Sequence, residues 1–209
     1  QGAHTHEIGL GSGALSIGMA RMGAASATGY ETNNRAKNFA GLNSVINGVA
    51  DNIIIRDGNP DNLWAPMRGI KSDYFICNPP FEPTPPGTKY YLHSAAGPYG
   101  LEFTERILEG LDEHLSDTGH GQVATFAPGS EYEPFMLCDL ARRYLPGKSE
   151  IVVNPLPTGY RAFLKRFKSF GVTKETIDEM VKQAQSQCVT HLHLCMLHYD
   201  KGEKTLDVR

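Results

Sequence analysis

The order of apolar segments along the chain restricts its fold more than any other feature. Short runs rich in β-branched residues alternate with longer segments that repeat apolar residues every three or four positions. We predict strands at 3–9, 25–31, 53–55, 74–77, 122–127, 150–153 and 190–198, and helices at 14–22, 34–46, 101–115, 134–144 and 173–187. Alternation of this kind builds a mostly parallel sheet with helices on both faces.

The two strands near residues 150 and 194 depart from that alternation, because an insert at about 154–188 separates them. We expect these strands to pair antiparallel. No repeat, low-complexity run or linker divides the 209 residues, so we expect a single domain over 1–209 that contains the insert. The chain starts at Gln1 without Met and enters a glycine cluster almost at once, which suggests a domain cut from a longer chain.

Composition excludes several classes of protein. The chain is 40% hydrophobic and 21% charged, which is a globular mixture. Its four cysteines form no CxxC pair, which argues against a zinc ribbon and a secreted disulfide scaffold, and we expect no metal. No apolar stretch approaches about 18 residues and no signal peptide opens the chain, so we expect a cytoplasmic protein without a membrane partner. The net charge of −3 argues against a uniformly basic coat for nucleic acid.

Polar or glycine residues follow four of the predicted strands. These four segments are Glu7–Gly13, Glu31–Asn33, Asp57–Asn59 and Asn78–Phe81. Ligands of open parallel sheets bind outside the carboxyl ends of the strands, at the point where the strand order reverses. We therefore expect the functional site at these four strand ends.

The first strand end carries Gly9, Gly11 and Gly13 between a strand and a helix. Glycine permits positive φ and lets a ligand approach the backbone closely, although a simple packing turn would also use it. The spacing G-x-G-x-G differs from the dinucleotide pattern G-x-G-x-x-G, and no Lys-Ser/Thr pair follows as in a phosphate loop. Glu7, just before the first glycine, would repel a pyrophosphate but can hold the ammonium group of an amino-acid ligand.

Two carboxylates follow at the second and third strand ends. Glu31 lies 18 residues after Gly13, where a carboxylate can accept both hydroxyls of a ribose. Asp57 lies where an adenine amino group would fall. A solvated charge at a strand end is the other interpretation of Glu31, and an Asp-Gly turn is the other interpretation of Asp57.

The fourth strand end carries the most specific pattern, the tetrad Asn78-Pro79-Pro80-Phe81 directly after an apolar strand. With the glycine turn upstream and the run 93–102 downstream, the chain resembles class I S-adenosylmethionine-dependent methyltransferases that methylate nitrogen. Within them it most resembles the small-domain group around the HemK/PrmC protein-glutamine methyltransferases, over about residues 3–153. The resemblance implies a Rossmann-like, seven-stranded, mostly parallel sheet with helices on both faces and an antiparallel last strand.

The resemblance also implies roles for the tetrad. The Asn78 side-chain oxygen and the Pro79 carbonyl would accept the two N–H bonds of an amide or amine, which turns the nitrogen lone pair toward the sulfonium methyl group. Pro79 and Pro80 would keep the turn rigid. Phe81 would stack on a planar substrate group.

The same resemblance implies the site of the cofactor, S-adenosylmethionine. The turn from Gly9 through Gly11 to Gly13 would pass beneath its methionine and ribose parts. Glu7 would face the amino group, Glu31 the ribose and Asp57 the adenine, and Asn78 would border the cofactor as well. The sequence departs from the family at Glu7, where Asp is usual, and at His4 and His6, which make the first strand less apolar.

The substrate is less constrained. Residues 142–174 hold eight basic residues against one acid, Glu150, with the aromatic residues Tyr160, Phe163, Phe167 and Phe170 interleaved among them. This segment fits a nucleic-acid-facing arm, and it equally fits an amphipathic helix docked on the core. The main hypothesis is an enzyme that methylates an amide or amine nitrogen of a protein or small metabolite. The alternative is methylation of an exocyclic amine of an RNA or DNA base, and a non-catalytic cofactor-binding module ranks last.

Four further histidines stand out by their positions. His191 and His193 share one face of the last predicted strand, close to His198. We expect them to face the surface rather than to hold a metal. His93 lies in the loop after the tetrad, which could close over a substrate.

Overall fold

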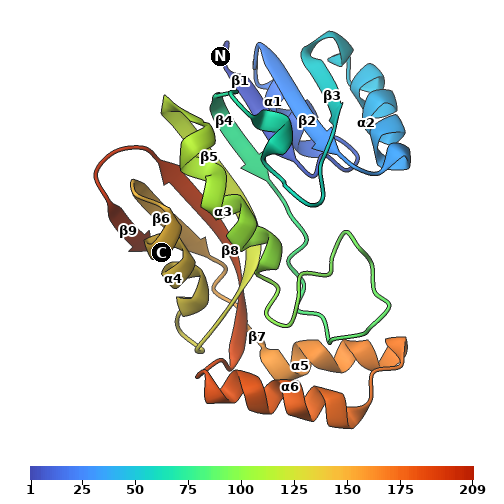
Figure 1. Cartoon of the computed structure of the whole chain (residues 1–209), viewed down its shortest axis with the longest axis vertical. Coiled ribbons are helices and arrows are strands. Elements are labelled where there is room, and N and C mark those ends of the chain that lie inside the picture. Colours follow the sequence, from blue (N-terminus) through green and yellow to red (C-terminus); the bar gives the residue numbers. More distant parts are fainter.

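The computed structural model describes all residues from 1 to 209 and has one central sheet (Figure 1). Its strands are β1 (His4–Ile8), β2 (Ser26–Glu31), β3 (Ile53–Asp57), β4 (Ser72–Cys77), β5 (Leu115–Gly129), β6 (Lys148–Val153), β7 (Thr158–Gly159), β8 (His191–Asp200) and β9 (Thr205–Val208). The α-helices are α1 (Ala14–Arg21), α2 (Asn34–Ile46), α3 (Glu102–His114), α4 (Phe135–Tyr144), α5 (Tyr160–Leu164) and α6 (Lys174–Ser186). Three 3-10 turns complete the chain, η1 (Ala50–Asn52), η2 (Ala65–Met67) and η3 (Lys165–Phe170).

The strand order is β3-β2-β1-β4-β5-β8-β6-β9, with β7 beside β8. The first five strands of that order are mutually parallel, and β8 runs antiparallel to both β5 and β6. This confirms a mostly parallel sheet and the antiparallel pair of strands near residues 150 and 194. The expected count of seven strands is wrong, because β7 and β9 bring it to nine. The last strand of the chain is β9, which is parallel to β6.

Helices cover both faces of the sheet, as predicted. Figure 1 shows α3 and α4 in front of it, and their apolar residues join a cluster of 19 buried side chains with β1, β4, β5, β6 and β8. Ile8 belongs to this cluster, so the neighbouring Glu7 must point to the opposite face. There Glu7 meets Ser16 of α1, which places α1 behind the sheet.

The burial of β8 corrects the prediction for its histidines. His193 is 2% exposed, and its Nε2 lies 2.9 Å from the Ser130 carbonyl oxygen. Leu194, on the other face, is 42% exposed. The covered face of β8 takes the odd-numbered positions because α3 and α4 pack there. His193 is therefore inside, and the expectation that it faces the surface is wrong, whereas His191 at the start of the strand is partly exposed.

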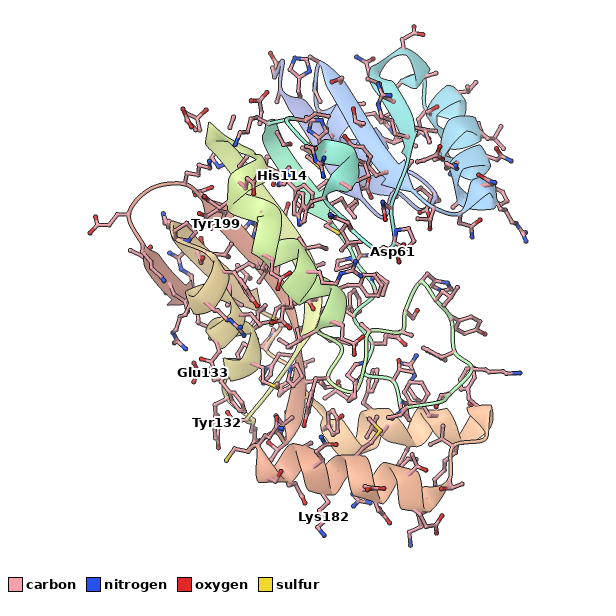
Figure 2. The ribbon with its side chains drawn as sticks, viewed as in Figure 1. Asp61, His114, Tyr132, Glu133, Lys182 and Tyr199 are labelled. Atoms are coloured by element: carbon pink, nitrogen blue, oxygen red, sulfur yellow. The ribbon has the colours of Figure 1, made fainter.

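The insert forms a second apolar cluster at the carboxyl ends of the parallel strands (Figure 1). Ten buried residues from α5, η3, α6 and the start of β8 make up this cluster. Tyr160, Phe163 and Phe167 are 2%, 7% and 0% exposed. The helix predicted at 173–187 appears as α6, whose Lys182 points away from the molecule (Figure 2). The insert is thus an amphipathic unit that buries three of its four aromatic side chains, while Phe170 stays 40% exposed.

No helix of the structure combines the length and the apolar character needed to cross a bilayer.

Candidate functional site

The glycine turn between β1 and α1 has a left-handed backbone at alternate residues. Gly9, Gly11 and Gly13 have φ of +80°, +54° and +84°. A Cβ at Gly13 would lie 3.1 Å from the Cβ of Ala40, so this glycine allows α1 and α2 to pack closely. A Cβ at Gly9 would meet nothing within 4 Å, and one at Gly11 only a backbone oxygen at 4.0 Å. Open space therefore lies directly over Gly9 and Gly11.

The carboxylate of Glu31 connects the end of β2 to the glycine turn. Its Oε2 accepts a hydrogen bond from the Gly11 N–H at 2.8 Å. Its Oε1 accepts from the backbone N–H groups of Thr32 and Asn33, both at 2.8 Å. The structure therefore brings Glu31 and the turn together, as the sequence predicted.

Glu7 is directed at α1. It is 3% exposed, and its Oε2 accepts hydrogen bonds from the Ser16 hydroxyl at 2.5 Å and the Ser16 N–H at 3.0 Å. Burial raises the pKa of Glu7 to about 7, and the two bonds from Ser16 oppose that shift. The other oxygen, Oε1, accepts no hydrogen bond. Glu7 is therefore a carboxyl group whose charge state changes near neutral pH.

Asp57 lies beside Glu31 in the register of β2 and β3. Its side chain is 86% exposed and forms an ion pair with Lys37 of α2. The hydrogen bond from Lys37 is the main reason that the pKa of Asp57 is lowered. The backbone N–H of Gly58 also donates to the Glu31 carbonyl oxygen at 3.0 Å, so the ends of β2 and β3 are joined.

The loop after β3 borders these strand ends. Figure 2 shows Asp61 in this loop, near the carboxyl ends of the parallel strands. Arg106 of α3 donates hydrogen bonds to the carbonyl oxygens of Pro60 at 2.7 Å and Asp61 at 3.0 Å. No local sequence pattern predicts this anchor, because 45 residues separate Arg106 from Asp61.

The tetrad follows β4 and lies beside the glycine turn. Cys77, the last residue of β4, donates its thiol to the Ile8 carbonyl oxygen at 3.0 Å, which joins the ends of β4 and β1. Asn78 comes next and is exposed, whereas Pro79 is buried. The Phe81 ring packs edge-on against Phe126 of β5 at a centroid distance of 5.2 Å. Asn78 is thus an accessible amide one residue beyond a fixed strand end.

The segment 78–100, here called the motif loop, folds back on itself. The Glu82 N–H donates to the Ser94 carbonyl oxygen at 2.8 Å, and the Thr84 N–H donates to the Gly97 carbonyl oxygen at 2.8 Å. Gly100 has φ of +75°, and a Cβ there would lie 2.4 Å from the Phe81 carbonyl oxygen. Only glycine therefore fits at position 100, where the returning part of the loop passes close to the tetrad.

Two further predictions concern the loop and the basic segment. His93 is exposed and stacks on Tyr91 at a centroid distance of 5.3 Å.

Four of the eight basic residues in 142–174 pair with acids: Arg142 with Asp139, Arg143 with Glu105, Arg161 with Asp178 and Arg166 with Glu82. Tyr160, Phe163 and Phe167 are buried, whereas Phe170 is 40% exposed. The packing of this segment therefore agrees with an amphipathic unit docked on the core.

No three histidine, cysteine or carboxylate side chains gather closely enough to hold a metal ion. The functional groups that do come together are the glycine turn, Glu31, Asp57 and the tetrad, all at the carboxyl ends of neighbouring strands.

Comparisons of the sequence with known proteins point to methyltransferases. Residues 1–79 match the family model of the ribosomal protein L11 methyltransferase, PrmA. A putative protein N5-glutamine methyltransferase from Methanocaldococcus jannaschii is 32% identical over 121 residues. That match covers 56% of this chain and 58% of the relative, so the chain spans little more than half the length of the relative.

Solved methyltransferase structures share the fold over nearly the whole chain. The catalytic domain of hMettl16, bound to an RNA hairpin from the MAT2A 3′UTR, has a TM-score of 0.61 and 15% identity, and the match covers 99% of this chain and 67% of that one. The ribosomal protein L11 methylase of Lactobacillus delbrueckii subsp. bulgaricus has a TM-score of 0.53 and 14% identity, with coverage of 97% and 72%. Identities this low concern the fold alone, which is the class I methyltransferase fold.

Proposed function

We propose that this protein binds S-adenosylmethionine at the carboxyl ends of β1, β2 and β3 and transfers its methyl group to a planar amide or amine nitrogen. The acceptor belongs to a protein or a small metabolite. The observation that carries the proposal is the accessible Asn78 of the Asn-Pro-Pro-Phe tetrad, which the Cys77–Ile8 hydrogen bond holds beside the glycine turn. The M. jannaschii relative, named as a putative protein N5-glutamine methyltransferase, supports nitrogen as the acceptor atom.

The residues at the strand ends fit this cofactor. The open space over Gly9 and Gly11 accommodates a ligand against the backbone. Glu31 stands at the edge of that space, where its carboxylate has lone pairs left for ribose hydroxyls. Glu7 lies beneath, with Oε1 free to accept from an ammonium group. Asp57 follows on the next strand, at the adenine end. When bound, the cofactor supplies an electrophilic methyl group on a sulfonium sulfur.

Asn78 and Pro79 supply the acceptors that an amide nitrogen needs. An amide nitrogen is a poor nucleophile because its lone pair is delocalised. The Asn78 side-chain oxygen and the Pro79 carbonyl accept its two N–H bonds and orient the lone pair. The nitrogen would gain an N–CH3 bond as the sulfonium S–CH3 bond breaks, and it would lose one of its protons to solvent water. Because positive charge develops on the nitrogen during transfer, these acceptors bind the transition state more strongly than the ground state. Pro79 and Pro80 fix the turn, and acceptors fixed in advance need little reorganisation.

The packing of the insert favours a protein or metabolite over a nucleic acid. Stacking on single-stranded nucleic acid needs exposed rings, and Tyr160, Phe163 and Phe167 are buried. Phosphate contacts need free cations, and four of the eight basic residues of 142–174 are already paired with carboxylates. Methylation of an exocyclic base amine is therefore the outcome that the test below must exclude.

A labelling experiment tests the proposal. The protein is incubated with methyl-labelled S-adenosylmethionine and a cell extract, and label is counted separately in protein, nucleic acid and small molecules. We expect label in protein or metabolite and none with Asn78→Ala, which should still bind S-adenosylhomocysteine in calorimetry. Label confined to nucleic acid would contradict the proposed acceptor. Full transfer by Asn78→Ala would contradict the role of Asn78. If the wild type releases no heat with S-adenosylhomocysteine, the proposed cofactor site is wrong.

A further inference from the structure

A polar cluster of three side chains links the insert to the motif loop. Arg166 on η3 donates a hydrogen bond from Nη2 to Oε2 of Glu82 at 2.8 Å, and the same nitrogen lies 2.5 Å from the Tyr90 hydroxyl oxygen. Tyr90 donates its hydroxyl to that carboxylate oxygen at 2.6 Å. Glu82 directly follows the tetrad, and Tyr90 lies on the outgoing part of the loop. One cation of the insert therefore holds two points of the motif loop.

Arg166 is itself held by aromatic rings. Its Cζ lies 4.7 Å from the centroid of Phe163 and 5.6 Å from that of Phe167, and both rings are buried in the second apolar cluster. A guanidinium that stacks on fixed rings loses less freedom when it forms hydrogen bonds than a free surface side chain does. The partner carboxylate of Glu82 is only 19% exposed. This pair therefore differs from an ordinary surface ion pair, which contributes little.

The cluster acts on the tetrad through the backbone. The Glu82 N–H donates to the Ser94 carbonyl oxygen at 2.8 Å, and the Glu82 carbonyl oxygen accepts from the Ala96 N–H at 3.2 Å. Glu82 is thus fixed by its side chain and its backbone, one residue after Phe81. A displacement of Glu82 would move the Phe81 ring away from Phe126 and alter the turn that carries Asn78.

We propose that Arg166 is a positioning residue for methyl transfer: through Glu82 it holds the motif loop so that Asn78 and Phe81 meet the acceptor nitrogen in a productive geometry. This inference rests on the proposed function. It assigns the insert a role in aligning the tetrad.

Arg161 provides a matched control. It lies on α5 of the same insert, its side chain is 50% exposed against 41% for Arg166, and it pairs with Asp178 of α6 at 2.5 Å. This pair connects two helices of the insert, and neither side chain forms a hydrogen bond or ion pair with the motif loop. Arg161→Ala therefore removes a comparable ion pair but leaves Glu82 in place.

Amide hydrogen exchange tests the anchoring without any substrate. In Arg166→Ala we expect the amides of Glu82 and Ala96 to exchange about tenfold faster than in the wild type, because local opening becomes easier. In Arg161→Ala they should exchange at the wild-type rate. Unchanged exchange in Arg166→Ala, or the same acceleration in both variants, would overturn the anchoring.

Steady-state kinetics test the role in the reaction, with the acceptor fraction that the wild type labels. Arg166→Ala should lower kcat by about tenfold to a hundredfold, since a misplacement of about 1 Å has effects of this size. The KM for S-adenosylmethionine should stay unchanged, and Arg166→Lys should recover part of kcat because it retains one charged donor. Arg161→Ala should keep the wild-type kcat.

The possible failures can be told apart. If the wild type transfers methyl groups and Arg166→Ala keeps full kcat, the positioning role is wrong and the proposed function stands. An equal loss of kcat in Arg166→Ala and Arg161→Ala would mean that the insert is merely destabilised, which also overturns it. If the wild type transfers no methyl group, both the proposed function and the positioning role are wrong. Hydrogen exchange then still decides whether Arg166 anchors the motif loop.

Discussion

Among single residues, Glu7 shows most directly how folding changes the chemistry of a side chain. The sequence places a carboxylate just before the glycine turn, where it would face an ammonium group. In the fold it is 3% exposed, and burial raises its pKa to about 7. A carboxyl whose pKa is raised on folding stabilises the native state at low pH, below its unfolded pKa. That contribution is lost as the pH rises through about 7, because the buried group must then ionise.

Glu7→Gln should therefore change how stability depends on pH. The shift from 4.5 to about 7 corresponds to about 3 kcal/mol of unfolding free energy, so the wild type should lose up to that amount between pH 4.5 and 8. In Glu7→Gln the unfolding free energy should fall by about 3 kcal/mol less over the same pH range. Urea unfolding at several pH values measures it, with Glu109→Gln on the exposed side of α3 as the control. An identical pH dependence in Glu7→Gln and the wild type would assign the loss to other groups.

At the scale of elements, the insert shows how one sequence pattern can serve two structures. Interleaved basic and aromatic residues suit both a nucleic-acid-binding arm and an amphipathic unit. The fold buries Phe167 completely in the second apolar cluster, while Phe170 at the end of η3 stays 40% exposed. These two rings, three residues apart, therefore have different roles, and the difference arises from packing.

Phe167→Ala and Phe170→Ala should differ accordingly. Loss of the Phe167 ring leaves a cavity in the second apolar cluster and should lower the free energy of unfolding by about 3–5 kcal/mol. Loss of the Phe170 ring should lower it by about 1 kcal/mol or less, because half-exposed rings bury less apolar area. Chemical denaturation of the two variants measures both values. Equal small effects would mean that Phe167 is not part of a core and would revive the nucleic-acid interpretation.

For the whole molecule, the candidate site depends on a parallel sheet that brings distant segments together. Glu7, Glu31, Asp57 and Asn78 come from four segments of the chain and lie at the carboxyl ends of the neighbouring strands β1, β2, β3 and β4. The order β3-β2-β1-β4 reverses direction at β1, which is where the glycine turn lies. A ligand bound there contacts several strands at once and should stabilise the entire fold. That residues 1–209 form one domain remains a prediction.

S-adenosylhomocysteine should therefore raise the melting temperature of the whole chain. At a ligand concentration about a hundred times its Kd, linkage predicts an increase of about 5–10 °C. Differential scanning calorimetry measures the shift. Asn78→Ala should keep it, because we place the main role of Asn78 at the acceptor, whereas Gly11→Val should lose it because its side chain fills the open space over the turn. A shift that survives in Gly11→Val would move the ligand to another part of the molecule.

By itself the sequence determined the order of most of the elements, and it predicted where along the chain a site would lie. The bounds of α2 and the turn at Gly9–Gly13 were predicted where the structure has them, and the tetrad at Asn78 directly follows β4 as expected. Apolar periodicity, turn residues and helix caps are local signals that act over a few residues, so a single sequence contains them in full.

Only the tertiary structure decided which faces are covered and which distant groups meet. It buried His193, added the short strands β7 and β9, and turned Glu7 toward Ser16. It also brought Arg166 to Glu82, across 84 residues of chain. These outcomes depend on packing between segments far apart in the sequence, and no pattern within a few residues specifies such packing.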